Sequence, residues 1–374
     1  MPGRESDISR RSFVQSAALP ALCMAAGCSE AVAAASLPRR EAQYYEKLLN
    51  KKIRCKLCPR ACVIDDRERG YCGVRENQNG TYYTLVHSRP CSIHIDPIEK
   101  KPLFHFYPGT LAFSLATAGC NVNCKFCQNW EISQVRPEQV RNAEMSPAQV
   151  AALARDNRCV SIAYTYSEPV VFYEYVYDTA IAGKAQGVKS VVITNGYIQE
   201  EPLKKLCAQV DGIKVDLKAF SEKFYREVVN GELKPVLDAL VTIRNQKTWL
   251  EIVYLVIPTL NDSDQELRSL CQWIRRELGT DVPVHFTRFH PEYLLKNLPP
   301  TPLATLERAK RIADAEGLNY AYIGNVPGHP AENTRCPRCE EVVIQRTGFM
   351  VEKMNLRKGA CTKCGTAIAG RWKS

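Results

Sequence analysis

The stretch Ala118-Gly119-Cys120-Asn121-Val122-Asn123-Cys124-Lys125-Phe126-Cys127 places three cysteines at the spacing C-x3-C-x2-C. An apolar run over residues 111–116 precedes it and is typical of a buried strand. Three thiolates on one tight loop can each bind one iron of a [4Fe–4S] cube, which leaves the fourth iron without a protein ligand. Clusters that only carry electrons are normally held by four cysteines. The loop therefore predicts a cluster with an open coordination position. A structural zinc site is the alternative, but it lacks a fourth cysteine nearby.

Outward from this loop, strand-like and helix-like segments alternate. The apolar strand-like runs are residues 111–117, 160–165, 190–194, 212–217, 250–257, 282–289 and 320–323. Helices are predicted after the Ser146-Pro147 capping pair and over residues 170–186, 262–278 and 302–316. This alternation predicts an α/β protein with a parallel sheet, built as a partial or full (β/α) barrel over residues 110–328. A doubly wound sheet is the alternative, but no G-x-G-x-x-G motif follows the first strand.

Composition limits the class of protein. The chain has 374 residues, of which 45% are hydrophobic, and this is enough for a large core. Beyond the N-terminus no purely apolar run reaches the length of about eighteen residues that a membrane-spanning helix needs, so a polytopic membrane protein is not expected. The net charge of +10 is scattered along the chain, and we expect no nucleic-acid partner. The 17 cysteines lie mostly in short clusters, which favours metal binding over disulfides.

Two further cysteine groups flank the predicted barrel. In an N-terminal module over residues 39–109, four cysteines have the spacing C-x2-C-x3-C-x9-C, which suits either zinc or a second iron–sulfur cluster; they are Cys55, Cys58, Cys62 and Cys72. A helix over residues 41–50 and a strand over residues 81–86 are also expected there. A C-terminal module over residues 329–374 carries two C-x2-C pairs, Cys336 with Cys339 and Cys361 with Cys364. They predict a zinc ribbon, with a rubredoxin-like iron site as the alternative.

Residues 1–38 resemble a targeting segment. Arg10 and Arg11 form a twin-arginine pair, and a moderately apolar run over residues 13–27 and several small residues follow. This layout predicts twin-arginine export to the cell envelope, a route for proteins that have already folded around cofactors. A tail that stays in the cytoplasm is the alternative, and in either case these residues are not expected to belong to the folded domains.

An iron with an open position can bind an amine and a carboxylate together, and S-adenosylmethionine offers that chelate. One electron passed into its sulfonium breaks a carbon–sulfur bond and gives a 5′-deoxyadenosyl radical. The cofactor performs this step, while the protein orients it and excludes water.

The cysteine loop, with Phe126 before its third cysteine, resembles the radical S-adenosylmethionine superfamily over residues 110–325. The segment Tyr166-Ser167-Glu168-Pro169 stands where activating enzymes of the pyruvate formate-lyase type have Gly-Gly-Glu-Pro. The resemblance implies that Glu168 holds the amino group of the cofactor and that Asp216 and Lys218 contact its ribose and carboxylate. The cofactor-binding residues that it implies are Phe126, Ser167, Glu168, Asn195, Asp216, Lys218, Ile257, Arg288 and Asn325.

A narrower resemblance covers nearly all of the chain after residue 38. The segments Cys55-Lys56-Leu57-Cys58-Pro59-Arg60 and Ile95-Asp96-Pro97-Ile98-Glu99-Lys100 are similar to those of AmmeMemoRadiSam-system radical enzymes. It implies two partner proteins of that system, and the wider family implies a glycyl-radical enzyme as partner and an electron donor such as flavodoxin or ferredoxin. The substrate stays open between a partner protein and a small molecule. A non-enzymatic zinc-ribbon or iron–sulfur protein, binding nucleic acid or carrying electrons, is the competing hypothesis.

Overall fold

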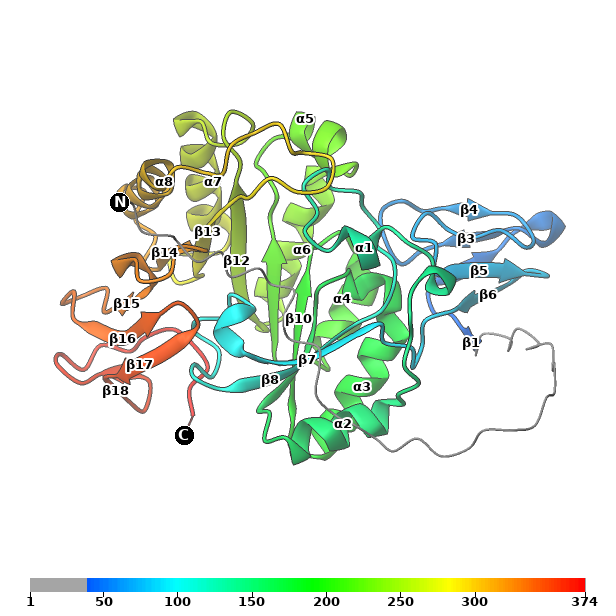
Figure 1. The fold of residues 1–374 in the computed structure, drawn as a ribbon, viewed down its shortest axis with the longest axis horizontal. Helices are drawn as coiled ribbons and strands as arrows, with labels where there is room; N and C mark the ends of the chain where they lie inside the picture. The colour runs from blue at the N-terminus through cyan, green and yellow to red at the C-terminus, as the bar shows by residue number, and fades with distance from the viewer. Residues whose placement is uncertain (1–38, 374) are drawn as a thin grey trace, which may run out of the picture. The chain divides into compact units, whose positions relative to one another are not determined.

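The computed structural model describes residues 39–373, and its central element is an open eight-stranded sheet (Figure 1). Seven strands run parallel in chain order, and the eighth is antiparallel at the edge. The parallel strands are β8 (Leu111–Ala116), β9 (Ser161–Tyr164), β10 (Lys189–Thr194), β11 (Gly212–Asp216), β12 (Trp249–Val256), β13 (Val284–Arg288) and β14 (Ala321–Gly324), and the edge strand is β7 (Ser92–Pro97). All seven predicted strands are thus confirmed.

Helices connect the parallel strands. The longer ones are α2 (Pro147–Asp156), α3 (Tyr173–Ala185), α4 (Glu200–Cys207), α6 (Leu233–Asn245), α7 (Asp264–Glu277) and α8 (Leu303–Ala315). Ser146 caps α2 as predicted, because its hydroxyl accepts a hydrogen bond from the Gln149 N–H. Since the strand order follows the chain order, right-handed crossovers place these helices on one face of the sheet. Within residues 39–373 no pairing joins β14 to β7, so the predicted barrel is a partial one.

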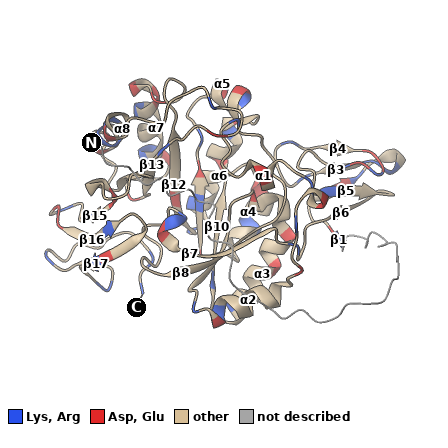
Figure 2. Ribbon diagram, in the orientation of Figure 1, with Lys and Arg blue, Asp and Glu red and all other residues tan. Residues whose placement is uncertain are grey.

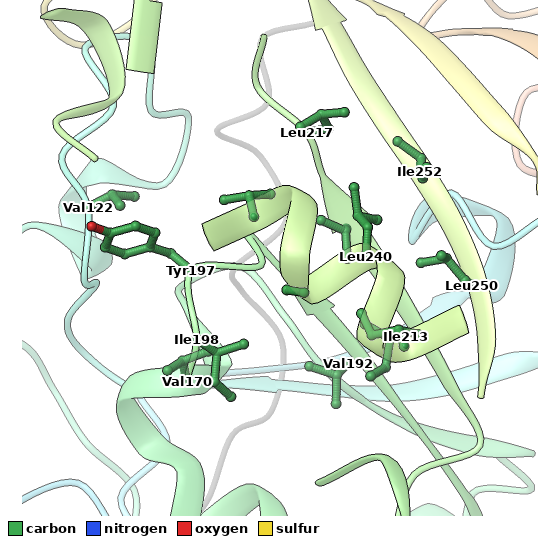
Figure 3. Packing of buried hydrophobic residues seen from close by; sticks show 14 of the residues in the cluster. Val122, Val170, Val192, Tyr197, Ile198, Ile213, Leu217, Leu240, Leu250 and Ile252 are labelled. Atoms are coloured by element: carbon green, nitrogen blue, oxygen red, sulfur yellow. The ribbon is translucent and has the colours of Figure 1, made fainter. Parts of the chain in front are cut away.

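The two faces of the sheet have different side chains, because successive residues of a strand point to opposite sides. On the helix-covered face, large apolar residues form the main core, and Figure 3 shows Leu240 of α6 near Ile213, Leu250 and Ile252 of the sheet. The inner face is more polar, and it includes the buried residues Lys214, Glu251 and His285. The concave side of the partial barrel can therefore hold charged side chains.

The segment between β7 and β8 lies against the inner face. Ile98, Leu103 and Phe106 form a small apolar cluster with inner-face residues of β8, β9 and β10. The Glu251 carboxylate fixes the segment further by accepting hydrogen bonds from the backbone N–H groups of Phe104 and His105, both at 2.9 Å. This segment therefore closes part of the concave side.

The N-terminal module consists of two small sheets, not the predicted helix. β1 (Arg40–Glu41) and β5 (Arg75–Gln78) pair with β6 (Thr81–Thr84), and β3 (Ile53–Cys55) pairs with β2 (Tyr45–Lys47) and β4 (Val63–Ile64). The helix expected over residues 41–50 is wrong, while the strand expected over residues 81–86 is present as β6. Tyr44 and Asn50 have φ angles of 58° and 56°, which a right-handed helix cannot contain. Pairing with β6 and β3 overrides the local helical pattern.

The C-terminal module is also built from antiparallel strands. β16 (Val342–Thr347) lies between β15 (Thr334–Arg335) and β17 (Met350–Met354), and β18 (Leu356–Arg357) pairs with β19 (Ala360–Cys361). Its apolar residues form a core cluster of their own with Phe104, Tyr320 and Tyr322. The module therefore packs against β14 and against the segment between β7 and β8.

The predicted export segment, residues 1–38, lies outside the described residues. Within residues 39–373, no helix is long and apolar enough to cross a membrane. Figure 2 shows Lys and Arg interspersed with Asp and Glu along the elements.

Candidate active site

The cysteine loop follows directly after β8, at the edge where the carboxyl ends of all parallel strands meet. In barrel folds this edge forms the active site. Backbone hydrogen bonds hold the loop, since the N–H groups of Asn123 and Lys125 donate to Val229 and Val228 at 3.1 and 2.9 Å. Gly119 has φ +97°, a conformation that a side chain would strain. The loop is thus anchored on both sides of Cys124.

The three thiols suit the predicted cluster. Cys124 is buried, Cys120 and Cys127 are half-buried, and none forms a disulfide. Burial raises the pKa of Cys124 to about 12, although the nearby Lys218 ammonium opposes this. A thiolate is the form that binds iron, so the positive charge of the bound iron ions would offset the cost of burying these sulfurs as thiolates. Asn195 Nδ2 donates to Cys120 Sγ at 3.9 Å. This donor set fits a [4Fe–4S] cluster.

Glu168 lies after β9, one strand along from the cysteine loop. Its buried carboxylate accepts hydrogen bonds from Val170 N at 3.1 Å, Thr194 Oγ1 at 2.5 Å and Asn195 N at 2.8 Å. Burial raises the pKa of Glu168 to about 7, and these donors limit the rise. The Ser167 hydroxyl is buried and has no hydrogen-bond partner among the described residues. The carboxylate and the hydroxyl are therefore fixed polar groups beside the loop.

Two lysines flank Asp216 at the end of β11. Lys218 Nζ lies 3.1 Å from the carboxylate, and Lys214 Nζ contacts its other oxygen. Burial alone would raise the pKa of Asp216, but the two ammonium groups lower it to about 2. Lys218 Nζ also lies 5.9 Å from the centroid of the Phe126 ring. The Asp216–Lys218 pair therefore reaches the cysteine loop.

The structure brings part of the predicted set together around the loop, namely Phe126, Glu168, Asn195, Asp216 and Lys218. Arg288 and Asn325 form a separate pair at the ends of β13 and β14, where Asn325 Nδ2 donates to the Arg288 carbonyl at 3.2 Å. Ile257 is fully buried, so its side chain packs in the main core.

Lys214, Asp96, Lys101 and Tyr166 are polar residues near the site that lie outside the predicted set. The Tyr166 hydroxyl contacts Asp96, and Lys101 Nζ lies 2.5 Å from the Asp96 carboxylate. Burial lowers the pKa of Lys101 to about 8. The signal for Lys214 was its position two residues before Asp216, because alternate residues of a strand share a face. Nothing in the sequence signalled the contact between Asp96 of β7 and Tyr166, which follows β9 and lies 70 residues away along the chain.

The C-terminal cysteines form a compact ligand group. All four sulfurs lie within 4.8 Å of one another, with Cys336 and Cys364 at 3.5 Å and Cys339 and Cys361 at 3.8 Å. Four thiolates around one ion with metal–sulfur bonds of about 2.3 Å place their sulfurs about 3.8 Å apart. The group can therefore hold a single tetrahedral metal ion. Among residues 39–373, no other group of cysteine, histidine or acidic ligands is this compact.

Comparison with known proteins gives four findings. Residues 114–271 match the family described as the Radical SAM superfamily. The chain is 46% identical over 331 residues to the uncharacterized protein MJ0808 of Methanocaldococcus jannaschii, covering 88% of this chain and 98% of that protein. It is 22% identical over 219 residues to the pyruvate formate-lyase 1-activating enzyme of Escherichia coli, covering 54% and 89%. A solved radical SAM methyltransferase from Sphaerobacter thermophilus is similar with a TM-score of 0.46 and 20% identity, covering 58% of this chain and 67% of that one.

Proposed function

The chain belongs to the radical SAM superfamily, and on this premise we propose that it reductively cleaves S-adenosylmethionine at a cluster held by Cys120, Cys124 and Cys127. The observation that carries the proposal is the meeting of this loop with Glu168 and Asp216 at the carboxyl edge of one parallel sheet. When bound, the cluster and the cofactor supply the electron transfer that gives a 5′-deoxyadenosyl radical.

The residues of the chain bind and orient the cofactor. Glu168 offers a carboxylate oxygen to the cofactor's amino group, while Thr194 and the Asn195 N–H hold that carboxylate in place. The unpartnered Ser167 hydroxyl lies in the same turn and offers a further hydrogen bond. Asp216 accepts a hydrogen bond from the ribose, and Lys218 donates one to the methionine carboxylate. Asn195, which donates toward Cys120, ties cofactor binding to the loop.

The radical removes a hydrogen atom from a partner protein or a small molecule. The similarity to pyruvate formate-lyase activating enzymes supports a glycyl-radical enzyme as the partner. Partner proteins of the AmmeMemoRadiSam system are the second candidate, and the resemblance of residues 55–60 and 95–100 to that system's radical enzymes favours them. A donor of the flavodoxin or ferredoxin class supplies the electron.

Anaerobic turnover tests this function. Reconstituted protein with dithionite and S-adenosylmethionine should release 5′-deoxyadenosine, and Cys124→Ala should not. The matched control is Cys207→Ala, a buried cysteine of α4 outside all three groups. If the wild type and Cys124→Ala release the same amount, the proposal fails.

We also propose that the C-terminal group binds zinc, because its sulfur separations suit one ion and its spacing is that of a zinc ribbon. Elemental analysis should find about one zinc in the purified protein, and none at this site in Cys339→Ala. Iron alone at this site would instead favour the rubredoxin-like alternative.

Export by the twin-arginine route is a further proposal, supported by Arg10 and Arg11 and by the apolar run and small residues that follow them. Fractionation of cells that express Arg10→Lys with Arg11→Lys tests it. An unchanged location of the variant would exclude this route.

A further inference from the structure

The four cysteines of the N-terminal module come together in the fold. Cys55 ends β3, Cys58 and Cys62 lie in the turn that follows, and Cys72 lies on the chain before β5. All four line one small cavity, together with Arg60 and other residues. We propose that they hold a second iron–sulfur cluster, which passes electrons to the cluster of the cysteine loop. The proposal rests on the proposed function for its electron acceptor.

The sulfur separations favour a cluster over a zinc ion. The C-terminal group already has the close separations of a single-ion site, whereas the N-terminal group does not form a set within 4.8 Å. Cys120, Cys124 and Cys127 do not form such a set either. Each thiolate of a [4Fe–4S] cube binds a different iron, so its sulfurs stand further apart than the ligands of one ion. In this respect the N-terminal group resembles the cysteine loop.

Arg60 supplies a positive charge for such a cluster. A cube held by four thiolates is an anion, and a buried anion needs a compensating charge. Arg60 lines the cavity, its guanidinium lies 3.5 Å from the centroid of the Tyr71 ring, and it makes no salt bridge with any described residue. It donates instead to the carbonyl oxygens of Asn121 at 2.5 Å and of Asn230. Its charge is therefore not cancelled by a carboxylate, and the same side chain touches the cysteine loop.

The two cysteine groups adjoin each other. Gly119 precedes Cys120, and a Cβ atom built on it would lie 2.8 Å from the carbonyl oxygen of Cys72. Cys72 and Cys120 also line one polar cavity of about 800 Å³. Asn121 lines the N-terminal cavity, and its side chain hydrogen-bonds Asn195, which donates to Cys120. Few atoms therefore separate the two groups.

The electron balance is simple. A donor of the ferredoxin or flavodoxin class gives one electron to the N-terminal cluster, which goes from the 2+ to the 1+ state. That cluster returns to 2+ when it reduces the cluster of the cysteine loop from 2+ to 1+. No bond forms or breaks and no proton moves in this step.

Metal analysis tests whether the second cluster exists. Anaerobically reconstituted protein should contain about eight irons and one zinc. About four irons should remain in the triple variant Cys120→Ala, Cys124→Ala, Cys127→Ala, and about four in Cys55→Ser with Cys58→Ser. Cys207→Ala should match the wild type. A wild type with about four irons and two zincs would overturn the proposal and needs no variant to fold.

The same variants separate this inference from the proposed function. If the triple variant loses all its iron while folding as judged by circular dichroism, the second cluster does not exist and the proposed function stands. If the triple variant keeps all the iron of the wild type, the proposed function fails.

Electron paramagnetic resonance tests the electron transfer. Two adjacent reduced clusters interact magnetically, so the dithionite-reduced wild type should give a broadened spectrum. The Cys55→Ser with Cys58→Ser variant should give the sharper signal of one isolated cluster. A wild-type spectrum equal to the sum of the two variants' spectra would show that the clusters do not interact, and would overturn the relay.

Discussion

The C-terminal cysteines and the cysteine loop after β8 present the same potential ligand atom in different arrangements. Cys336 and Cys361 lie in a small apolar cluster of their own, with sulfurs drawn to single-ion distances. Cys124 belongs to the main core of the partial barrel, and its loop carries three thiols without a fourth. A closed set of four ligands stabilises a module, whereas an open set of three leaves room for a cofactor. Spacing and surroundings, not residue type, separate the two.

Cys124→Ala should have the largest effect. Without this ligand the cluster is lost or incomplete, so 5′-deoxyadenosine formation should fall by about a thousandfold or more, to background. Chromatographic detection of 5′-deoxyadenosine under dithionite measures the effect. The same assay on Cys336→Ala should show near wild-type release. Equal losses in the two variants would remove the distinction between the open and closed sets.

Asp216→Asn should have the next largest effect, and on stability as well as binding. The substitution leaves Lys214, whose side chain is only 5% exposed, without its carboxylate partner. Removing one partner of a buried ion pair costs about 3 kcal/mol in the free energy of unfolding. Denaturant unfolding of the metal-free protein measures this cost.

The matched control for that loss is Asp238→Asn. Asp238 pairs with Lys234 four residues away on exposed α6 surface, 2.7 Å apart, and this contact contributes only about 0.5 kcal/mol. Similar losses in the two variants would mean that water reaches Lys214 freely.

The parts of the fold that were predictable are those fixed by local pattern. The runs that became β8 to β14 are apolar because parallel strands are buried on both faces, so their positions could be read directly. Of the predicted residues, Glu168 follows β9 and Asp216 ends β11, and the parallel arrangement brings them to one edge. The helix expected over residues 41–50 failed because β-pairing decided that segment: Glu41 pairs with the distant Tyr83, and residues 45–47 form a hairpin with residues 53–55.

Side-chain pairing between distant segments could not be predicted. The contact of Tyr166 with Asp96, 70 residues apart along the chain, and the burial of Lys214 depend on how β7 and the segment after it lie against the inner face. Arg60, which joins the N-terminal module to Asn121, lies 61 residues from it along the chain. Such contacts are set by tertiary packing, and no local spacing signals them.

Glu168→Gln should change the pH dependence of cofactor binding. Burial raises the pKa of Glu168 to about 7, so below that pH the carboxyl is mainly protonated and lacks the negative charge that strengthens its hydrogen bond from the cofactor's amino group. Wild-type affinity relative to Glu168→Gln should therefore rise about tenfold between pH 6 and pH 8. Equilibrium binding of S-adenosylmethionine at several pH values measures the ratio. A constant ratio would mean that Glu168 is already ionised at pH 6.

The smallest effect on catalysis is expected from Cys336→Ala with Cys339→Ala. The pair removes two of the four C-terminal ligands, so the metal should be lost and the module's strands, which pack on Phe104 and Tyr322, should loosen. The cysteine loop lies at the carboxyl ends of the strands and belongs to the main core, so 5′-deoxyadenosine formation should change by less than about twofold. Thermal unfolding should nevertheless begin at a lower temperature, because the metal's contribution to folding is gone. A much larger loss of activity would mean that the buried contacts of His105 and Arg346, which join this module to the segment after β7, also hold the inner face in its active arrangement.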